Sequence, residues 1–236
     1  MDPLAKLLRP KKLEEVFGQE HLLAHQQALL QKGSFILWGP PGCGKTTIAR
    51  IIGEQPGVRF FAISAVYDGV AELRKVFRQA EEVSLLTSKS ILFVDEIHRF
   101  NRGQQDALLS AIEEGLLRLI GATTENPSFS LNAALLSRTQ VLTLKPLDED
   151  ALESLLKRAA DHIKRPLPLE ATAREKLLQL ADGDGRYLLN LAELLYDQPE
   201  ATKLNTDQMM EVLRHRAPQY DRAGVPHYNL ISALHK

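Results

Sequence analysis

The chain has 236 residues, enough for one large or two modest domains, and its 44% hydrophobic and 25% charged residues are ordinary for a soluble globular protein. The formal net charge of −1 excludes a globally basic surface, so any contact with nucleic acid must come from a local patch. A single cysteine, Cys43, excludes an intrachain disulfide and is typical of a reducing cytoplasm, and no apolar run is long enough to span a bilayer.

The first predicted strand, Phe35–Trp38, leads into a glycine-rich segment that is followed by a predicted helix, Thr46–Ile52. The segment reads GPPGCGKT at residues 39–46 and fits the pattern G-x-x-x-x-G-K-[ST] at every fixed position. Its glycines allow a tight turn that exposes backbone N–H groups to a phosphate, and the following helix N-terminus adds to this anion site. The pattern therefore predicts a phosphate loop, with Lys45 reaching the β- and γ-phosphates of a nucleotide and the Thr46 hydroxyl binding Mg²⁺.

Four more strands and four more helices are predicted before residue 145. The strands are rich in aromatic, β-branched or continuous apolar residues, and they are Val58–Ile63, Ile91–Val94, Leu116–Ala122 and Val141–Leu144. The helices are Glu20–Gln31, Val70–Leu86, Arg102–Glu113 and Asn132–Leu136. Because strands alternate with helices, this part of the chain is predicted to be an α/β fold, a P-loop three-layer αβα sandwich with a parallel sheet.

Beyond Pro146 the pattern changes to helices alone. The predicted helices are Asp148–His162, Leu169–Ala181, Arg186–Tyr196 and Thr206–Arg216, and no strand is evident among them. Asp148 and Thr206 are candidate N-caps and Gly183 is a candidate C-terminal stop. We therefore predict a nucleotide-binding core at residues 1–146, an all-α second domain at 147–217 and a linker at 218–236.

An acidic pair, Asp95 and Glu96, directly follows the apolar strand Ile91–Val94. In a parallel sheet, ligands collect at the carboxyl ends of the strands, which places this pair near the phosphate loop. We expect Asp95 to hold Mg²⁺, directly or through water, and Glu96 to orient and polarise the water that attacks the γ-phosphate. The alternative is that the pair merely caps the next helix.

Two threonines and two arginines are weaker candidates when they are considered alone. Thr123 and Thr124 end the next strand, where a hydroxyl can reach a γ-phosphate or the attacking water. Arg138 and Arg186 could stabilise the charge on a transferring phosphoryl group, although a lone arginine is more often a solvated surface residue.

These residues, in this order, resemble the AAA+ ATPases. The phosphate loop resembles their Walker A motif and residues 91–96 resemble Walker B; Thr124, with Thr123 as the fallback, resembles sensor 1. Arg138 resembles the arginine finger of clamp-loader subunits, and Arg186 resembles sensor 2 of the helical lid. The segment from Arg9 through Phe17 to Gln19 resembles the part that packs against adenine, and Ser64 occupies the place of a residue that switches the Walker B glutamate.

The resemblance implies ATP and Mg²⁺ as cofactors and a set of site residues. The catalytic residues implied are Lys45, Glu96, Thr124 and Arg138, and the metal ligands are Thr46 and Asp95. The nucleotide-binding residues implied are Gly39, Pro40, Pro41, Gly42, Cys43, Gly44, Lys45, Thr46, Thr47, Arg9, Phe17 and Arg186.

Within that superfamily, longer strings resemble the RarA/MgsA family of replication-associated recombination proteins, which are similar to the Werner-helicase-interacting ATPase of eukaryotes. The strings are DEIHRFN at residues 95–101 and IGATTENPSF at 120–129, and residues 228–236 resemble that family's linker. The family continues into a helical C-terminal domain that forms tetramers. Since this chain ends at Lys236, we expect it to lack that domain and its homo-oligomer to be weakened.

The resemblance implies a cytoplasmic, nucleoid-associated ATPase that depends on DNA and acts at stalled or damaged replication forks, in recombination and repair. Expected partners are DNA with single-strand/duplex junctions or ends, and a single-strand-binding protein; no membrane partner is expected. The alternatives are a clamp-loader-like or branch-migration ATPase subunit, and a low-turnover scaffold gated by ATP.

A candidate DNA contact lies after the acidic pair, in the loop His98–Gln104 that leads into a predicted helix N-terminus. Free backbone N–H groups there favour a phosphate; Arg99 and Arg102 add positive charge, and Asn101 and Gln104 add neutral donors. The alternative is that both arginines are surface charges, or that Arg99 pairs with a nearby carboxylate.

Overall fold

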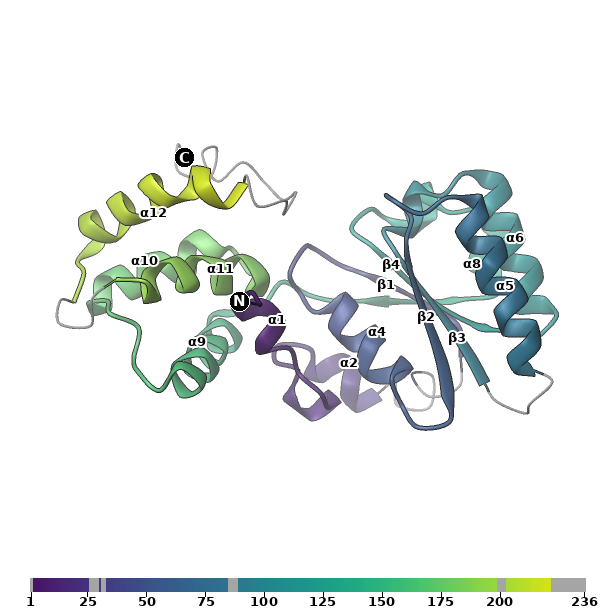
Figure 1. Cartoon of the computed structure of the whole chain (residues 1–236), viewed down its shortest axis with the longest axis horizontal. Coiled ribbons are helices and arrows are strands. Elements are labelled where there is room, and N and C mark those ends of the chain that lie inside the picture. Colours follow the sequence, from purple (N-terminus) through teal and green to yellow (C-terminus); the bar gives the residue numbers. More distant parts are fainter. Residues whose placement is uncertain (1, 26–29, 31–32, 85–88, 199–202, 222–236) are drawn as a thin grey trace. The chain divides into compact units, whose positions relative to one another are not determined.

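The computed structural model of the chain contains two compact units, residues 10–145 and residues 1–9 together with 146–236 (Figure 1). The structure describes residues 2–25, 30, 33–84, 89–198 and 203–221. The end of the predicted helix Glu20–Gln31, the last two residues of Val70–Leu86 and most of the predicted linker 218–236 lie outside these ranges.

The first unit is built on a five-stranded sheet whose recorded pairings are all parallel, in the order β2-β3-β4-β1-β5. Its strands are β1 (Phe35–Trp38), β2 (Val58–Ser64), β3 (Lys89–Asp95), β4 (Arg118–Thr123) and β5 (Gln140–Thr143). The predicted α/β fold with a parallel sheet is confirmed. The predicted strand Leu116–Ala122 begins two residues too early, because Gly115, at φ 69°, and the two residues after it still belong to the turn.

Helices cover both faces of this sheet (Figure 1). They are α2 (Glu20–His25), α4 (Lys45–Gly53), α5 (Val70–Ser84), α6 (Arg102–Glu113), α7 (Pro127–Ser130) and α8 (Ala133–Ser137), with short 3₁₀ turns η1 (Leu13–Glu15) and η2 (Ile97–Arg99). The short helix α7 was not predicted; Asn126 caps it by accepting a hydrogen bond from the backbone N–H of Ser128.

Alternate residues of β3 enter the two apolar cores, as expected of a strand buried on both faces. Leu92 and Val94 pack with residues of α5, α6 and α8, whereas Ile91 and Phe93 pack with residues of α2 and α4. The continuous apolar sequence of this strand therefore follows from its central position in a three-layer sandwich.

The register of the sheet brings the carboxyl ends of its strands to one edge. Trp38 of β1 is paired with Thr123 of β4, and Ser64 of β2 with Asp95 of β3. The first N–H of the phosphate loop, on Gly39, donates to the carbonyl oxygen of Thr123 at 3.2 Å. The loops that carry the predicted chemistry therefore emerge side by side.

The second unit is helical: α1 (Leu4–Leu7), α9 (Glu149–Ile163), α10 (Ala171–Ala181), α11 (Gly185–Tyr196) and α12 (Thr206–Asp221). Asp148 caps α9 as predicted, since its carboxylate accepts from the N–H of Ala151 at 2.9 Å. Thr206 is not the cap of α12. The cap is Asn205, one residue earlier, whose side chain accepts from the N–H of Gln208 and whose N–H donates to the side chain of Gln208. No helix in the described ranges is both long and apolar enough to cross a membrane.

Two further features of the helical unit differ from the sequence prediction. Leu169 is not helical: it forms an isolated parallel bridge with Leu204, a pairing between segments far apart in the chain. Residues 1–9, which we assigned to the nucleotide-binding core, group with this unit, where the N–H of Leu4 donates to the carboxylate of Glu193 at 3.3 Å.

Candidate active site

The phosphate loop joins β1 to α4 and uses its glycines in different ways. Gly42 and Gly44 have φ values of 66° and 105°, in the left-handed region that side chains disfavour. Gly39 is required for another reason: a Cβ built there would lie 2.7 Å from the backbone oxygen of Leu144, which cannot rotate away. The loop therefore packs closely on the end of β5 and still exposes its turn.

Lys45 begins α4, and its residue is only 7% exposed. Its ammonium donates to the carbonyl oxygens of Gly39 and Pro40, each at 2.7 Å. These bonds hold the positive charge inside the loop, where phosphate oxygens would replace the two carbonyl oxygens as its partners. Thr46 and Thr47 follow in the first turn of α4 and are half-buried.

Gln19 is a supporting residue that the sequence analysis named only as the end of a segment. It is fully buried, its Nε2 donates to the carbonyl oxygens of Cys43 and Lys145 at 3.3 and 2.8 Å, and its Oε1 accepts from the N–H of Lys145 at 3.2 Å. One amide thus joins the phosphate loop to the chain beyond β5. No spacing rule marks such a residue, because its partners lie 24 and 126 positions away.

The acidic pair lies at the carboxyl end of β3. Asp95 is the last residue of the strand, and Glu96 adopts φ 52° and ψ 45°, a left-handed conformation that is unusual for a residue with a side chain. Such a conformation costs on the order of 1–3 kcal/mol and persists only where the surroundings enforce it. The buried Ile97 that follows anchors the turn. The strained backbone thus fixes the position from which the side chain of Glu96 leaves the chain.

The two threonines that end β4 have different environments. Thr124 is exposed and its hydroxyl is 3.5 Å from Oε2 of Glu96, a long contact that nevertheless places it beside the carboxylate. Thr123 is fully buried and its hydroxyl is 2.8 Å from Nδ1 of His98, which in turn is 3.3 Å from Oε2 of Glu96. Thr124 is therefore the threonine that meets Glu96 directly, and sequence reasoning missed the link through His98.

Arg138 follows α8, and its Nε donates to a carboxylate oxygen of Glu113 at 2.9 Å. Their side chains are 55% and 45% exposed, so this ion pair contributes roughly 0.2–1 kcal/mol. A pair this weak can be exchanged for another partner. Ser64, at the end of β2, is half-buried opposite Asp95 in the register, and its proposed switching role stays a prediction.

The predicted adenine and sensor 2 residues are divided between the two units. Phe17 belongs to the sheet unit and is half-buried, whereas Arg9 and Arg186 belong to the helical unit. Arg186 lies in the first turn of α11 and is exposed; burial raises the pKa of its neighbour Tyr187, with a further contribution from Asp184. The roles of these residues toward a nucleotide stay predictions.

The loop proposed to contact DNA ends in a reciprocal cap of α6. The side chain of Asn101 accepts from the N–H of Gln104, and the side chain of Gln104 accepts from the N–H of Asn101, each at 3.0 Å. Two backbone N–H groups that we expected to be free are thus satisfied within the helix. Arg99 and Arg102 are exposed, and neither has an ion pair recorded within the described residues.

Two family models match this chain. A model described as ATPase family associated with various cellular activities (AAA) matches residues 35–147, and one described as AAA C-terminal domain matches residues 163–236. The first spans the phosphate loop, the acidic pair and the threonines at the end of β4. Fold, loop and models together define an AAA ATPase.

Two bacterial relatives show which AAA proteins this chain is similar to. Replication-associated recombination protein A of Haemophilus influenzae is 45% identical over 99% of this chain and 56% of that protein, and the protein of that name from Coxiella burnetii is 46% identical over the same shares. The chain is similar to these replication-associated recombination proteins over nearly its whole length and spans about 56% of theirs. Among solved structures, the Thermotoga maritima RuvB Holliday junction branch migration motor is 28% identical, with a TM-score of 0.70 over 89% of this chain and 73% of that one.

We predict that Gln19→Leu weakens ATP binding about fivefold or more, because the phosphate loop loses its tie to the chain beyond β5 and buried backbone groups lose their partners. Titration with a fluorescent ATP analogue measures the affinity, and urea unfolding measures the stability.

Gln105 provides a matched control. It is also a buried glutamine with three hydrogen bonds, but its partners are the backbones of Phe100, Ser130 and Asn132. Gln105→Leu and Gln19→Leu should each lower the free energy of unfolding by about 1–3 kcal/mol. Equal ATP affinities in the two variants would contradict a specific role for Gln19.

Proposed function

We propose that this chain hydrolyses ATP with Mg²⁺ and that DNA at stalled or damaged replication forks controls the reaction. The observation that carries the proposal is the shared edge of β1, β3 and β4, where the phosphate loop, Glu96 and Thr124 emerge side by side. Phosphoryl transfer needs positioned charge more than covalent chemistry, and this edge supplies it.

The residues fit ATP and a magnesium ion. The left-handed turns at Gly42 and Gly44 and the buried ammonium of Lys45 suit a phosphate chain, and Asp95 and Thr46 would supply the oxygen ligands that Mg²⁺ prefers. Within the described residues no cluster of three His, Cys, Asp or Glu could hold a metal by itself. The bound ion would neutralise charge that develops on the phosphate oxygens.

The protein's own part in the reaction is divided among three side chains. Lys45 binds the phosphates, Glu96 accepts a hydrogen bond from the attacking water and orients it, and Thr124 holds the water or the γ-phosphate at the same edge. The left-handed backbone of Glu96 fixes the position of its Cβ, and the carboxylate lies 3.5 Å from the hydroxyl of Thr124.

Lys45→Ala should lower ATP affinity by about tenfold or more, since a charge-assisted contact is lost, whereas Glu96→Gln should bind ATP normally and hydrolyse it roughly 10²-fold or more slowly. Nucleotide titration and phosphate release measure the two properties. Lys75→Ala and Glu72→Gln, which break an exposed ion pair on α5, are matched controls and should behave like the parent. If both site variants lose affinity equally, the division of labour is refuted.

Arg138 is proposed to act on the nucleotide of a neighbouring subunit. Its exposed pair with Glu113 is weak enough to be replaced by a phosphate. Such arginines contribute about 10³–10⁵ in rate in the best-studied cases.

Mixing Arg138→Ala with Lys45→Ala subunits should therefore restore part of the ATPase activity lost in each, because mixed interfaces join an intact arginine to an intact phosphate loop. Glu113→Gln, which removes only the resting partner, should keep its rate within about fivefold of the parent. Absence of recovery at every mixing ratio, with mixed assembly confirmed by cross-linking, would count against action between subunits.

The names of the relatives, which mention replication and recombination, support the DNA part of the proposal. A single-strand-binding protein as a further partner and the nucleoid as the place of action belong to the same proposal and are not named by these relatives. Similarity to a branch migration motor favours a second candidate, movement of DNA junctions. ATPase rates with no DNA, single strands, blunt duplex, gapped duplex and forks separate the two, and an ATP-gated scaffold would show low turnover with all of them.

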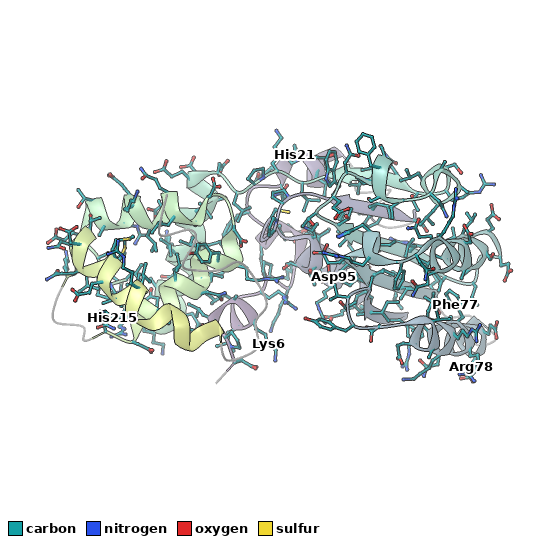
Figure 2. All side chains as sticks on the ribbon, turned by 90° about the horizontal axis from the view of Figure 1, so that it is seen from above. Lys6, His21, Phe77, Arg78, Asp95 and His215 are labelled. Carbon is teal, nitrogen blue, oxygen red and sulfur yellow. The ribbon has the colours of Figure 1, made fainter. Side chains whose placement is uncertain are left out.

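Arg99 and Arg102 are proposed to contact DNA phosphates beside the α6 cap. Arg102→Ala should weaken binding to all DNAs alike, flatten the salt dependence of log K by about one unit and leave ATPase activity without DNA nearly intact. Arg78→Ala is the matched control, an exposed arginine on α5 that Figure 2 shows well away from Asp95. Parent affinity and slope in Arg102→Ala would exclude this loop as the DNA contact.

A further inference from the structure

His98 is a buried polar side chain between the two parts of the site that do the chemistry. It lies in η2, directly after the acidic pair, and its side chain is only 5% exposed. Nδ1 is 2.8 Å from the hydroxyl of Thr123 and 3.3 Å from Oε2 of Glu96, while Nε2 is 3.4 Å from the carboxylate of Glu125. The imidazole thus bridges the end of β3 to the end of β4.

The hydrogen-bond network assigns the proton on Nδ1. The Thr123 hydroxyl has one proton, and it donates to the carbonyl oxygen of Glu125 at 3.2 Å while accepting from the N–H of Glu125 at 3.0 Å. The arrangement that satisfies this hydroxyl places the proton on Nδ1, which then donates to Thr123 and lies 3.3 Å from Oε2 of Glu96.

This arrangement treats the two carboxylate oxygens of Glu96 differently. Oε2 lies 3.3 Å from Nδ1 of His98 and accepts from the hydroxyl of Thr124 at 3.5 Å. No hydrogen bond to Oε1 is recorded from the part of the chain that the structure describes. One oxygen is therefore held by the protein and the other is left for the attacking water.

We propose that His98 is the positioning residue of Glu96: its Nδ1–H, held by the Thr123 hydroxyl, fixes the carboxylate so that Oε1 meets the water. The proposal rests on the proposed ATPase function. Misplacing a reacting group by about 1 Å can cost roughly 10²-fold in rate, so a contact of this kind matters for turnover and little for ATP binding. It also couples the end of β4 to Glu96, because movement of Thr123 displaces the imidazole.

Three substitutions at one position separate positioning from packing. Asn places its amide nitrogen where Nδ1 lies and keeps the donor; Gln places its nitrogen near Nε2 and loses it; Ala removes both. His98→Ala and His98→Gln should lower kcat by about ten- to a hundredfold with ATP affinity within about twofold of the parent, and His98→Asn should recover most of the rate.

Thr123→Val and Glu125→Gln extend the test. Thr123→Val removes the oxygen that orients the imidazole, so it should lower kcat like His98→Ala, and the double variant should be no slower than the worse single variant. Glu125→Gln is the matched control, since that carboxylate is 59% exposed and faces Nε2; its rate should stay within about threefold of the parent.

The measurements are ATP affinity, kcat, KM and urea unfolding for each variant. Rates that follow the order of stability rather than the presence of a donor, or equal losses in the Asn and Ala variants, would overturn the proposal for His98 alone. If the parent and Glu96→Gln hydrolyse ATP equally fast, the proposed function fails and this inference fails with it.

Discussion

The register of the parallel sheet is the constraint on which the candidate site depends. β3 is apolar on both faces, so alternation of residue type does not distinguish one register from the next. Side-chain packing distinguishes the registers instead. A Cβ at Gly121 of β4 would lie 2.6 Å from Ile36 of β1 and 3.1 Å from Ile97, so the two isoleucine side chains pack closely only where a glycine lies between them. That fit places Thr123 beside the phosphate loop and Asp95 at the same edge.

The site combines a rigid frame with exchangeable charges. Buried amides and a buried imidazole, on Gln19, Gln105 and His98, satisfy backbone and hydroxyl groups in surroundings where an unpaired polar group is costly. Arg138 and Glu113, by contrast, form an exposed pair that changes partner at little cost. The neutral, buried contacts set the geometry, and the exposed arginines remain available to an anionic partner.

Much of this could be predicted because the signals are local. The glycine positions of the phosphate loop, the apolar run before Asp95 and the Asp148 cap each depend on neighbours within a few residues, and α6 begins and ends where the pattern of Arg102–Glu113 predicts. The error at Leu169 has a distant cause: this residue lies just before α10 and is held by Leu204, a partner that spacing does not reveal.

The sequence by itself determined the phosphate loop, the acidic pair and the α/β class, because each follows from residue types at short, fixed spacing. Only the tertiary structure decided that Gln19 supports the loop, that His98 links Thr123 to Glu96, and that Glu113 is the resting partner of Arg138. These contacts join residues that are mostly more than 20 positions apart, and their formation depends on strand order, register and burial, which no short segment of the chain encodes.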